Sequence, residues 1–317
     1  MNQQQIIELD QIIEDFIKNN DYYIQTLPIV VKYSKKVFQE NEIFHNNDWS
    51  RKFSLNESIN IIYTFLETID KNLANQFLNI INSKDTDNKP YVNFLSKSEY
   101  PNGEDRVDSD GRVYIYYENT PNDIFIILHE LLHKMNECMI TDNHYDIYDS
   151  ITRNYLSETV SILGEMMIGN YLLECRLITE NDFNKRKNKR IIDTKGNARD
   201  IIVENELINL KLKKGQITFQ NLIDVLKQYD KSSIEYKILE DEKNDLKRIK
   251  SILRNKKLNL KRSERYVIAK VLVNEFLKRD TLTEDFIKLH NTVGNVDTSI
   301  DEVIDYLNIG LSQTSSK

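Results

Sequence analysis

The stretch Thr120-Pro-Asn-Asp-Ile-Phe-Ile-Ile-Leu-His-Glu-Leu-Leu-His133 decides how the rest of this 317-residue chain is interpreted. Proline suits the first position of a helix, because its missing N–H would have no partner there. The side chains of Thr120 and Asp123 can cap the same helix end. We therefore expect a helix that begins at Pro121 and runs to about Met139.

Two histidines on this helix form the candidate chemical centre. At 3.6 residues per turn, His129 and His133 lie one above the other on one face, so their rings can reach one metal ion. Glu130 lies beside them. Two histidines with a glutamate between them are the zincin pattern, in which zinc lowers the pKa of its bound water and the glutamate takes the proton. The sequence thus predicts one Zn²⁺ per chain and Glu130 as general base.

Two histidines need a third ligand, and the segment Tyr155–Glu165 offers two glutamates. Glu158 and Glu165 are seven residues apart, about two turns, so both lie on one face of an apolar helix. A carboxylate on such a face requires a partner. We interpret Glu158 as the third metal ligand and Glu165 as an acceptor that orients a ligand histidine. A plain salt-bridged role for Glu165 stays open.

The segment before the helix is the clearest strand of the chain. Arg112 to Tyr117 reads Arg-Val-Tyr-Ile-Tyr-Tyr, rich in β-branched and aromatic residues. Side chains alternate between the two faces of a strand, so one face should pack into the core and the other can touch substrate. Tyr114 and Tyr116 are the candidate substrate-binding residues. A strand placed beside the metal helix can hold an extended peptide.

These motifs together resemble the thimet oligopeptidase and oligoendopeptidase F family of zinc peptidases. The resembling features are His129-Glu-Leu-Leu-His133, Glu158 25 residues later within Ser-Glu-Thr-Val-Ser161, and Glu165. The resemblance covers Ser54 to Leu177. The chain departs from the family pattern at Leu132, where the family has glycine, and at Asn136, where it has histidine.

The resemblance implies a gluzincin-type catalytic domain in which His129, His133 and Glu158 bind zinc. It also implies that the strand Arg112 to Glu118 lies at the edge of its sheet and lines the substrate site. Family members stabilise the oxyanion with side chains near the C-terminus, and Tyr266 is the nearest equivalent. The alternative is that Tyr266 only packs a helix. No histidine lies between Glu158 and Tyr266 to match the family's loop histidine.

The rest of the chain predicts a mainly helical protein. Apolar residues make up 40% and charged residues 29%, and none of the four prolines comes after Pro121. We expect a helical N-terminal region over residues 1–83 and a catalytic region with a small sheet over 84–317. Residues 178–197 are polar and predict a loop or a frayed helix. The expected helices are Gln5–Asn19, Tyr33–Glu40, one capped by Ser54 and Glu57, Leu73–Ile81 and Ser150–Cys175, and the expected second strand is Tyr91–Leu95.

The remaining features concern compartment and partners. The chain has two cysteines, no secretory signal and no apolar run long enough to span a bilayer, so we expect a cytoplasmic protein without membrane contact. The net charge is −7, yet Lys243 to Arg265 carries ten Lys or Arg against two acids. Aromatic residues hardly interleave with this basic block, so a nucleic-acid partner is not expected and the block is not assigned.

The sequence therefore predicts a zinc-dependent metallo-endopeptidase of the oligopeptidase type that acts on peptide or protein substrates. Two alternatives stay open. One is a protease of a single folded protein, such as an effector or toxin component. The other is a catalytically idle scaffold that zinc stabilises and that contacts anionic partners through the basic block.

Overall fold

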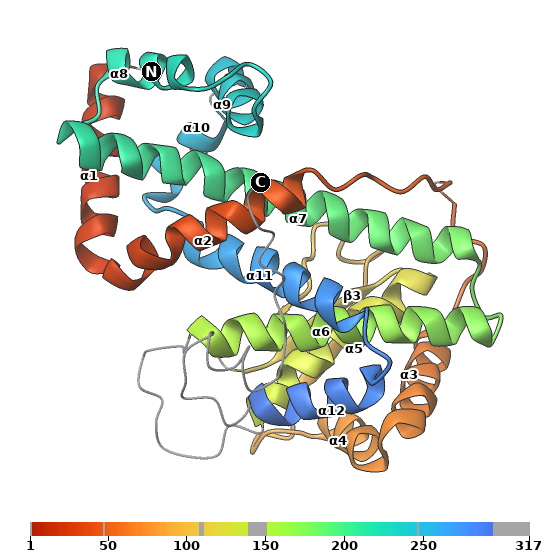
Figure 1. Ribbon diagram of the computed structural model, residues 1–317. Helices are drawn as coiled ribbons and strands as arrows, with labels where there is room; N and C mark the ends of the chain where they lie inside the picture. The colour runs from red at the N-terminus through yellow and green to blue at the C-terminus, as the bar shows by residue number, and fades with distance from the viewer. Residues whose placement is uncertain (1, 47, 108–110, 139–150, 246, 294–317) are drawn as a thin grey trace. The chain divides into compact units, whose positions relative to one another are not determined.

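The structure is a computed structural model that describes residues 2–46, 48–107, 111–138, 151–245 and 247–293 (Figure 1). The chain divides into two units, which we describe separately. Unit 1 comprises residues 1–42 and 190–271, and unit 2 comprises residues 43–189 and 272–317. Two long helices, α7 (Glu180–Lys214) and α11 (Leu260–Phe276), contribute residues to both units.

The expectation of a mainly helical chain with a small sheet is confirmed. Among the described residues, no helix is both long and apolar enough to cross a membrane. Besides its parts of α7 and α11, unit 1 contains α1 (Gln3–Asn19), α2 (Asp21–Phe38), α8 (Phe219–Asp224), the 3₁₀ turn η1 (Val225–Gln228), α9 (Ile234–Asp245) and α10 (Lys247–Asn255). Unit 2 contains α3 (Leu55–Ile69), α4 (Lys71–Asn82), β1 (Val92–Ser96), β2 (Arg106–Val107), β3 (Val113–Tyr117), α5 (Pro121–Cys138), α6 (Ile151–Glu174) and α12 (Leu282–Val293).

Of the two expectations for residues 178–197, the loop is wrong, whereas the helix is confirmed from Glu180 onward, without fraying, because α7 is continuous from Glu180 to Lys214. Its start is held by Asp182, whose carboxylate accepts hydrogen bonds from the backbone N–H and the hydroxyl of Thr179. The same carboxylate accepts a hydrogen bond from the backbone N–H of Ser50. The polar composition of this segment suits a helix of which one face packs and the rest is solvated.

The sheet has three strands in the order β1-β3-β2. β3 pairs in parallel with β1 over its whole length, and in antiparallel with β2 at Arg106↔Tyr114 and Val107↔Val113. The expectation that Arg112 to Glu118 forms an edge strand is therefore wrong, since β3 is the central strand. Beyond β2, the backbone N–H of Tyr116 donates to Asp105. Both sides of β3 are thus occupied.

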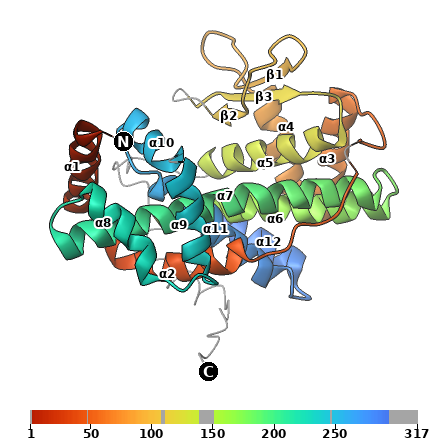
Figure 2. The ribbon, with the colours of Figure 1, turned by 90° about the horizontal axis from the view of Figure 1, so that it is seen from above.

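Helix α5 is the centre of unit 2. Figure 2 shows the sheet on one side of α5 and α6 on the other, and contacts with β3 and α6 support this arrangement. Apolar side chains surround α5 on all these sides, and Ile124, Phe125, Leu128 and Leu131 are fully buried. A helix that is apolar nearly all round belongs in a core. Any polar side chain that α5 carries inward must therefore find its partner on α6 or on the sheet.

The approach of α6 to α5 depends on one glycine. A Cβ atom at Gly164 would lie 2.6 Å from Cδ1 of Leu132, closer than real contacts allow. Leu132 lies between the two histidines in the sequence. The missing side chain at Gly164 therefore allows α6 to pack closely against α5 beside the histidines.

Candidate metal centre

The start of α5 is tied to the end of β3 by a buried carboxylate. Asp123 accepts hydrogen bonds from the backbone N–H groups of Glu118 and Thr120. This confirms the expected capping by Asp123, whereas the side-chain hydroxyl of Thr120, the other expected cap, has no hydrogen-bond partner among the described residues. Burial raises the pKa of the Asp123 carboxyl to about 6, although these hydrogen bonds act to lower it. The sheet and the helix that carries the histidines are therefore connected rigidly at this corner.

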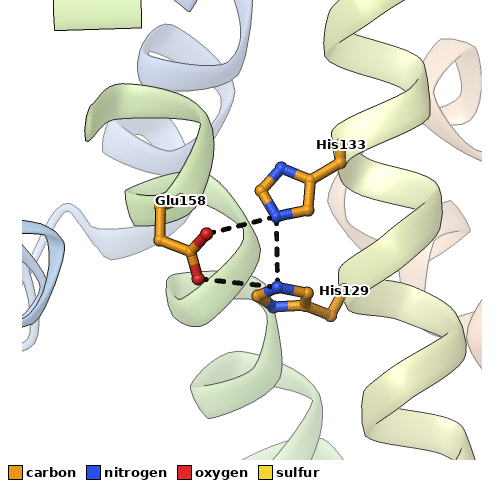
Figure 3. Close-up of side chains that lie close together, drawn as sticks. All are labelled: His129, His133 and Glu158. Atoms are coloured by element: carbon orange, nitrogen blue, oxygen red, sulfur yellow. Dashed lines mark hydrogen bonds and ion pairs between the residues drawn. The ribbon is translucent and has the colours of Figure 1, made fainter. Parts of the chain in front are cut away.

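Three side chains from α5 and α6 converge on one point (Figure 3). Nε2 of His129 lies 3.1 Å from Nε2 of His133. The carboxylate of Glu158 places one oxygen 3.6 Å from the first nitrogen and the other 3.4 Å from the second. Together these residues form a group that can hold a metal ion. The helical spacing brings the histidines together, and the packing of α6 against α5 adds the carboxylate.

The three separations fit a tetrahedral ion. Ligand atoms about 2.1 Å from zinc at tetrahedral angles lie about 3.4 Å from one another. The observed values of 3.1, 3.4 and 3.6 Å bracket that distance. His129 and Glu158 are buried, whereas the side chain of His133 is 23% exposed. The site is therefore closed on the side of His129 and Glu158 and more open on the side of His133.

A buried ion pair orients the ring of His129 through Nδ1, the nitrogen that does not face the metal-binding group. Nδ1 of His129 lies 2.7 Å from Glu165, and Nε of Arg186 donates to the other oxygen of that carboxylate at 2.8 Å. Arg186 also donates to the side chain of Asn122. The histidine proton is then assigned to Nδ1, which leaves the lone pair of Nε2 for a metal. The interpretation of Glu165 as an orienting acceptor agrees with this geometry.

A second contact orients His133. Its Nδ1 lies 2.8 Å from the hydroxyl of Ser157, which also accepts a hydrogen bond from the side-chain amide of Asn136. A proton on Nδ1 of His133 again leaves Nε2 with its lone pair. Two such lone pairs and a carboxylate then face one another at separations of 3.1 to 3.6 Å, and a cation between them relieves the repulsion. The donor set therefore fits a bound divalent ion.

Glu130 lies on α5 beside this group and is half-buried. The carboxylate of Asp105, on the segment before β2, lies near enough to sense its charge. Burial, together with the negative charge of Glu130, raises the pKa of the Asp105 carboxyl above its usual range. The environment of Glu130 thus includes a second carboxyl group, which the sequence did not single out.

The remaining candidate residues are three tyrosines. Tyr116 is 7% exposed, and its ring packs against Gly103 and edge-on against Tyr100. Tyr114 is half-buried on the same strand. Tyr266 belongs to α11 in unit 1, where it is half-buried and its hydroxyl accepts a hydrogen bond from Arg265. The substrate-binding and oxyanion roles of these three tyrosines stay predictions.

Three residues of the site were not found from the sequence. Arg186 lies in a polar segment that was interpreted as a loop or a frayed helix, Ser157 is an ordinary helical serine, and Asp105 lies in a polar stretch with turn residues. A stable helix over residues 180–189 would have placed Arg186 on a face that can pack against its neighbours. Nothing in the local pattern distinguishes Ser157 or Asp105, because their partners are distant in sequence.

Comparison of the chain with protein-family models, curated proteins and solved structures finds no match. The likeness to the oligopeptidase family therefore depends on the motif residues alone.

Proposed function

We propose that this chain is a zinc-dependent metallo-endopeptidase that hydrolyses peptide bonds with Glu130 as general base. The observation that carries the proposal is the set of separations among His129, His133 and Glu158, which match a tetrahedral site. Three protein ligands leave a fourth position for water or substrate, as in catalytic zinc sites, whereas structural sites have four protein ligands.

Each residue then has a defined task. Glu165 and Ser157 hold the two imidazole rings so that both Nε2 atoms face one point. A zinc ion at this point would activate water and polarise a carbonyl. Glu130 accepts the proton of the attacking water at its carboxylate and passes it to the leaving amine.

The arrangement of the sheet favours a narrow choice of substrate as a second candidate. Because Asp105 and β2 occupy the side of β3 away from β1, an extended peptide cannot add to β3 while they stay in place. A substrate that binds along β3 has to displace them. One folded protein with additional contacts can supply the binding energy for this more readily than a short peptide.

The test combines metal content with hydrolysis. Zinc is measured in the purified wild type and in Glu130→Gln, and both are incubated with a quenched peptide library and with a mixture of folded proteins. We expect one zinc per chain in both proteins and cleavage only by the wild type. Glu137→Gln is the matched control, because Glu137 lies on the same helix and pairs with Lys134 at its last turn. This control should retain full activity.

Each outcome has a defined meaning. Cleavage of many peptides supports a general oligopeptidase, and cleavage of one folded protein supports the narrower protease. Wild-type protein that holds zinc and cuts nothing rejects the enzyme and leaves the zinc-stabilised scaffold. Wild-type protein that binds no divalent ion rejects the whole proposal.

A further inference from the structure

Unit 1 contains a cavity of about 650 Å³ between α1 and the start of α11. Figure 2 shows α1 beside α10, and the two helices are in contact. The cavity is lined by four cations, Lys256, Lys257, Lys261 and Arg262, against one acid, Asp15. We call it the basic cavity. Its volume is in the range of small-molecule sites. All four cations belong to the basic block, and none of them belongs to the metal centre.

The backbone that carries these cations, from the loop at Lys256 to the first turn of α11, is anchored by a buried carboxylate. The buried carboxylate of Glu204 accepts hydrogen bonds from the backbone N–H groups of Asn259 and Leu260, each at 2.9 Å. The same carboxylate pairs with the buried Arg248. The first amides of α11 are therefore already used, so an anion in the cavity is recognised by the cationic side chains and not by the helix end.

Three of the four cations have little competition for their charge. Lys257 and Arg262 are exposed and make no ion pair with another described residue. Lys256 pairs with Glu8, but its side chain is 63% exposed, and such pairs contribute little in water. Like charges gathered around a concave surface raise its positive potential and attract anions.

Part of the cavity wall is apolar. Ile12 and Phe16 of α1 line it together with Leu258, which is 7% exposed. A simple inorganic anion would leave this wall in contact with water. A ligand that has both an apolar body and a charged end makes use of the wall and of the cations at once.

We propose that the basic cavity binds a phosphorylated organic anion of the size of a nucleotide, with its phosphates on the lysines and its body against Phe16. A single-stranded nucleic acid is the less suitable ligand, because it requires an extended cationic track with several stacking aromatics. Phe16 is the one aromatic residue among those that line the cavity. The proposal does not depend on the metal centre, since every residue involved belongs to unit 1.

Calorimetry on the full-length, metal-loaded protein tests this with four probes: ATP, inorganic tripolyphosphate, adenosine and a single-stranded oligonucleotide. Zinc content is measured afterwards, so that loss of metal to a phosphate is not taken for binding. We expect ATP to bind more tightly than tripolyphosphate, and adenosine alone to give no signal. The affinity for ATP should fall as salt is added.

Two sets of variants locate the binding. Lys257→Gln with Arg262→Gln should weaken ATP binding at least about tenfold. Lys213→Gln with Lys214→Gln removes the same charge from exposed positions at the end of α7, outside the cavity, and should leave binding unchanged. Lys256→Gly should also weaken it. Lys256 has φ 56°, a conformation that glycine adopts without strain, so this variant loses a charge without loss of stability.

Three results would overturn the proposal. The first is no binding of ATP at millimolar concentration. The second is binding that the cavity variants and the α7 control variant weaken equally, which would show only general attraction to positive charge. The third is an oligonucleotide that binds more tightly than ATP and loses its affinity in the cavity variants. Tripolyphosphate that binds as tightly as ATP would likewise remove the role of the apolar wall.

Discussion

The metal centre and the basic cavity place charged groups in opposite ways. In the metal centre, His129, Glu158 and Glu165 are buried, and a second side chain holds each histidine ring. In the basic cavity the lysines are exposed, and only the backbone beneath them is held, by Glu204. A small ion requires ligands at fixed positions, whereas a larger anion can be met by lysine side chains that adjust to it.

This difference predicts how each region responds to substitution. A buried group that loses its partner keeps the full cost of desolvation, whereas an exposed group regains water. Single substitutions should therefore act strongly in unit 2 and weakly among the exposed charges of unit 1. Four predictions test this contrast, from the largest expected effect to the smallest.

The largest effect is expected at the third ligand. Glu158→Gln removes the negative charge from the group but keeps its shape, and zinc affinity should fall by more than about a hundredfold, because loss of an outer partner alone costs 10–100-fold. Competition with a chromophoric chelator measures the affinity. Glu174→Gln, an exposed position at the end of the same helix, is the control. Equal affinity in wild type and Glu158→Gln would exclude Glu158 as a ligand.

The second prediction concerns the ion pair behind His129. Arg186→Met leaves the fully buried Glu165 without its cation and should destabilise the metal-free protein by about 3–5 kcal/mol. Arg199→Met breaks a pair with Asp241 whose members are 36% and 49% exposed, so it should change stability by less than about 1 kcal/mol. Urea unfolding compares the two. The contrast between the two regions fails if both substitutions have the same effect.

The third prediction concerns a buried histidine whose ring, unlike the rings of His129 and His133, has no hydrogen-bond partner among the described residues. This residue, His290 on α12, is 2% exposed. Burial lowers its pKa from 6.5 to about 4. The folded state binds this proton less readily than the unfolded state, so stability is complete above pH 6.5 and is lost as pH falls to about 4.

The loss assigned to His290 is about 3 kcal/mol, from 1.36 kcal/mol for each pKa unit. Other groups titrate in the same range, and the raised pKa of Asp123 acts with the opposite sign. The comparison is therefore between wild type and His290→Met, by urea unfolding at several pH values. The variant should lose less stability on acidification. Parallel pH profiles would mean that folding does not lower the pKa of His290.

The smallest effect concerns two glycines. Gly164→Ala forces a Cβ against Leu132 between α5 and α6 and should destabilise unit 2 by about 1–3 kcal/mol. Gly196 lies inside α7 in unit 1, and a Cβ atom there would meet no other atom within 4 Å, so alanine should stabilise the helix by up to about 1 kcal/mol. Thermal unfolding distinguishes the opposite signs. A stabilising Gly164→Ala would show that α6 can move away from α5 without loss.

Several elements were predictable because their causes are local. The helix at Pro121 begins where its capping residues predict, and His129 and His133 share a face because residues four apart always do in a helix. The spacing of Glu158 and Glu165 placed both on one face of α6. The spacing alone does not show which of the two glutamates binds the metal, because either one can face the histidines.

Other elements depend on pairing between distant segments. The sequence of β3 predicts a strand, but its neighbours follow from the short segment at Asp105 to Val107, which has almost no strand signal of its own. Arg186 was missed because the polar residues around it predict exposure. Its burial is explained by partners that are distant in the sequence, the carboxylate of Glu165, 21 residues away, and the side chain of Asn122.

The sequence by itself determined the helical class, the pair of histidines and the residues that can complete a metal site, because helix periodicity relates positions within a few turns. The tertiary structure alone decided which glutamate meets both Nε2 atoms, which groups orient the rings, and that β3 is a central strand. It also gathered four cations of the basic block around a cavity beside α1. These arrangements depend on packing between segments that are far apart in the chain, and no local sequence pattern specifies such packing.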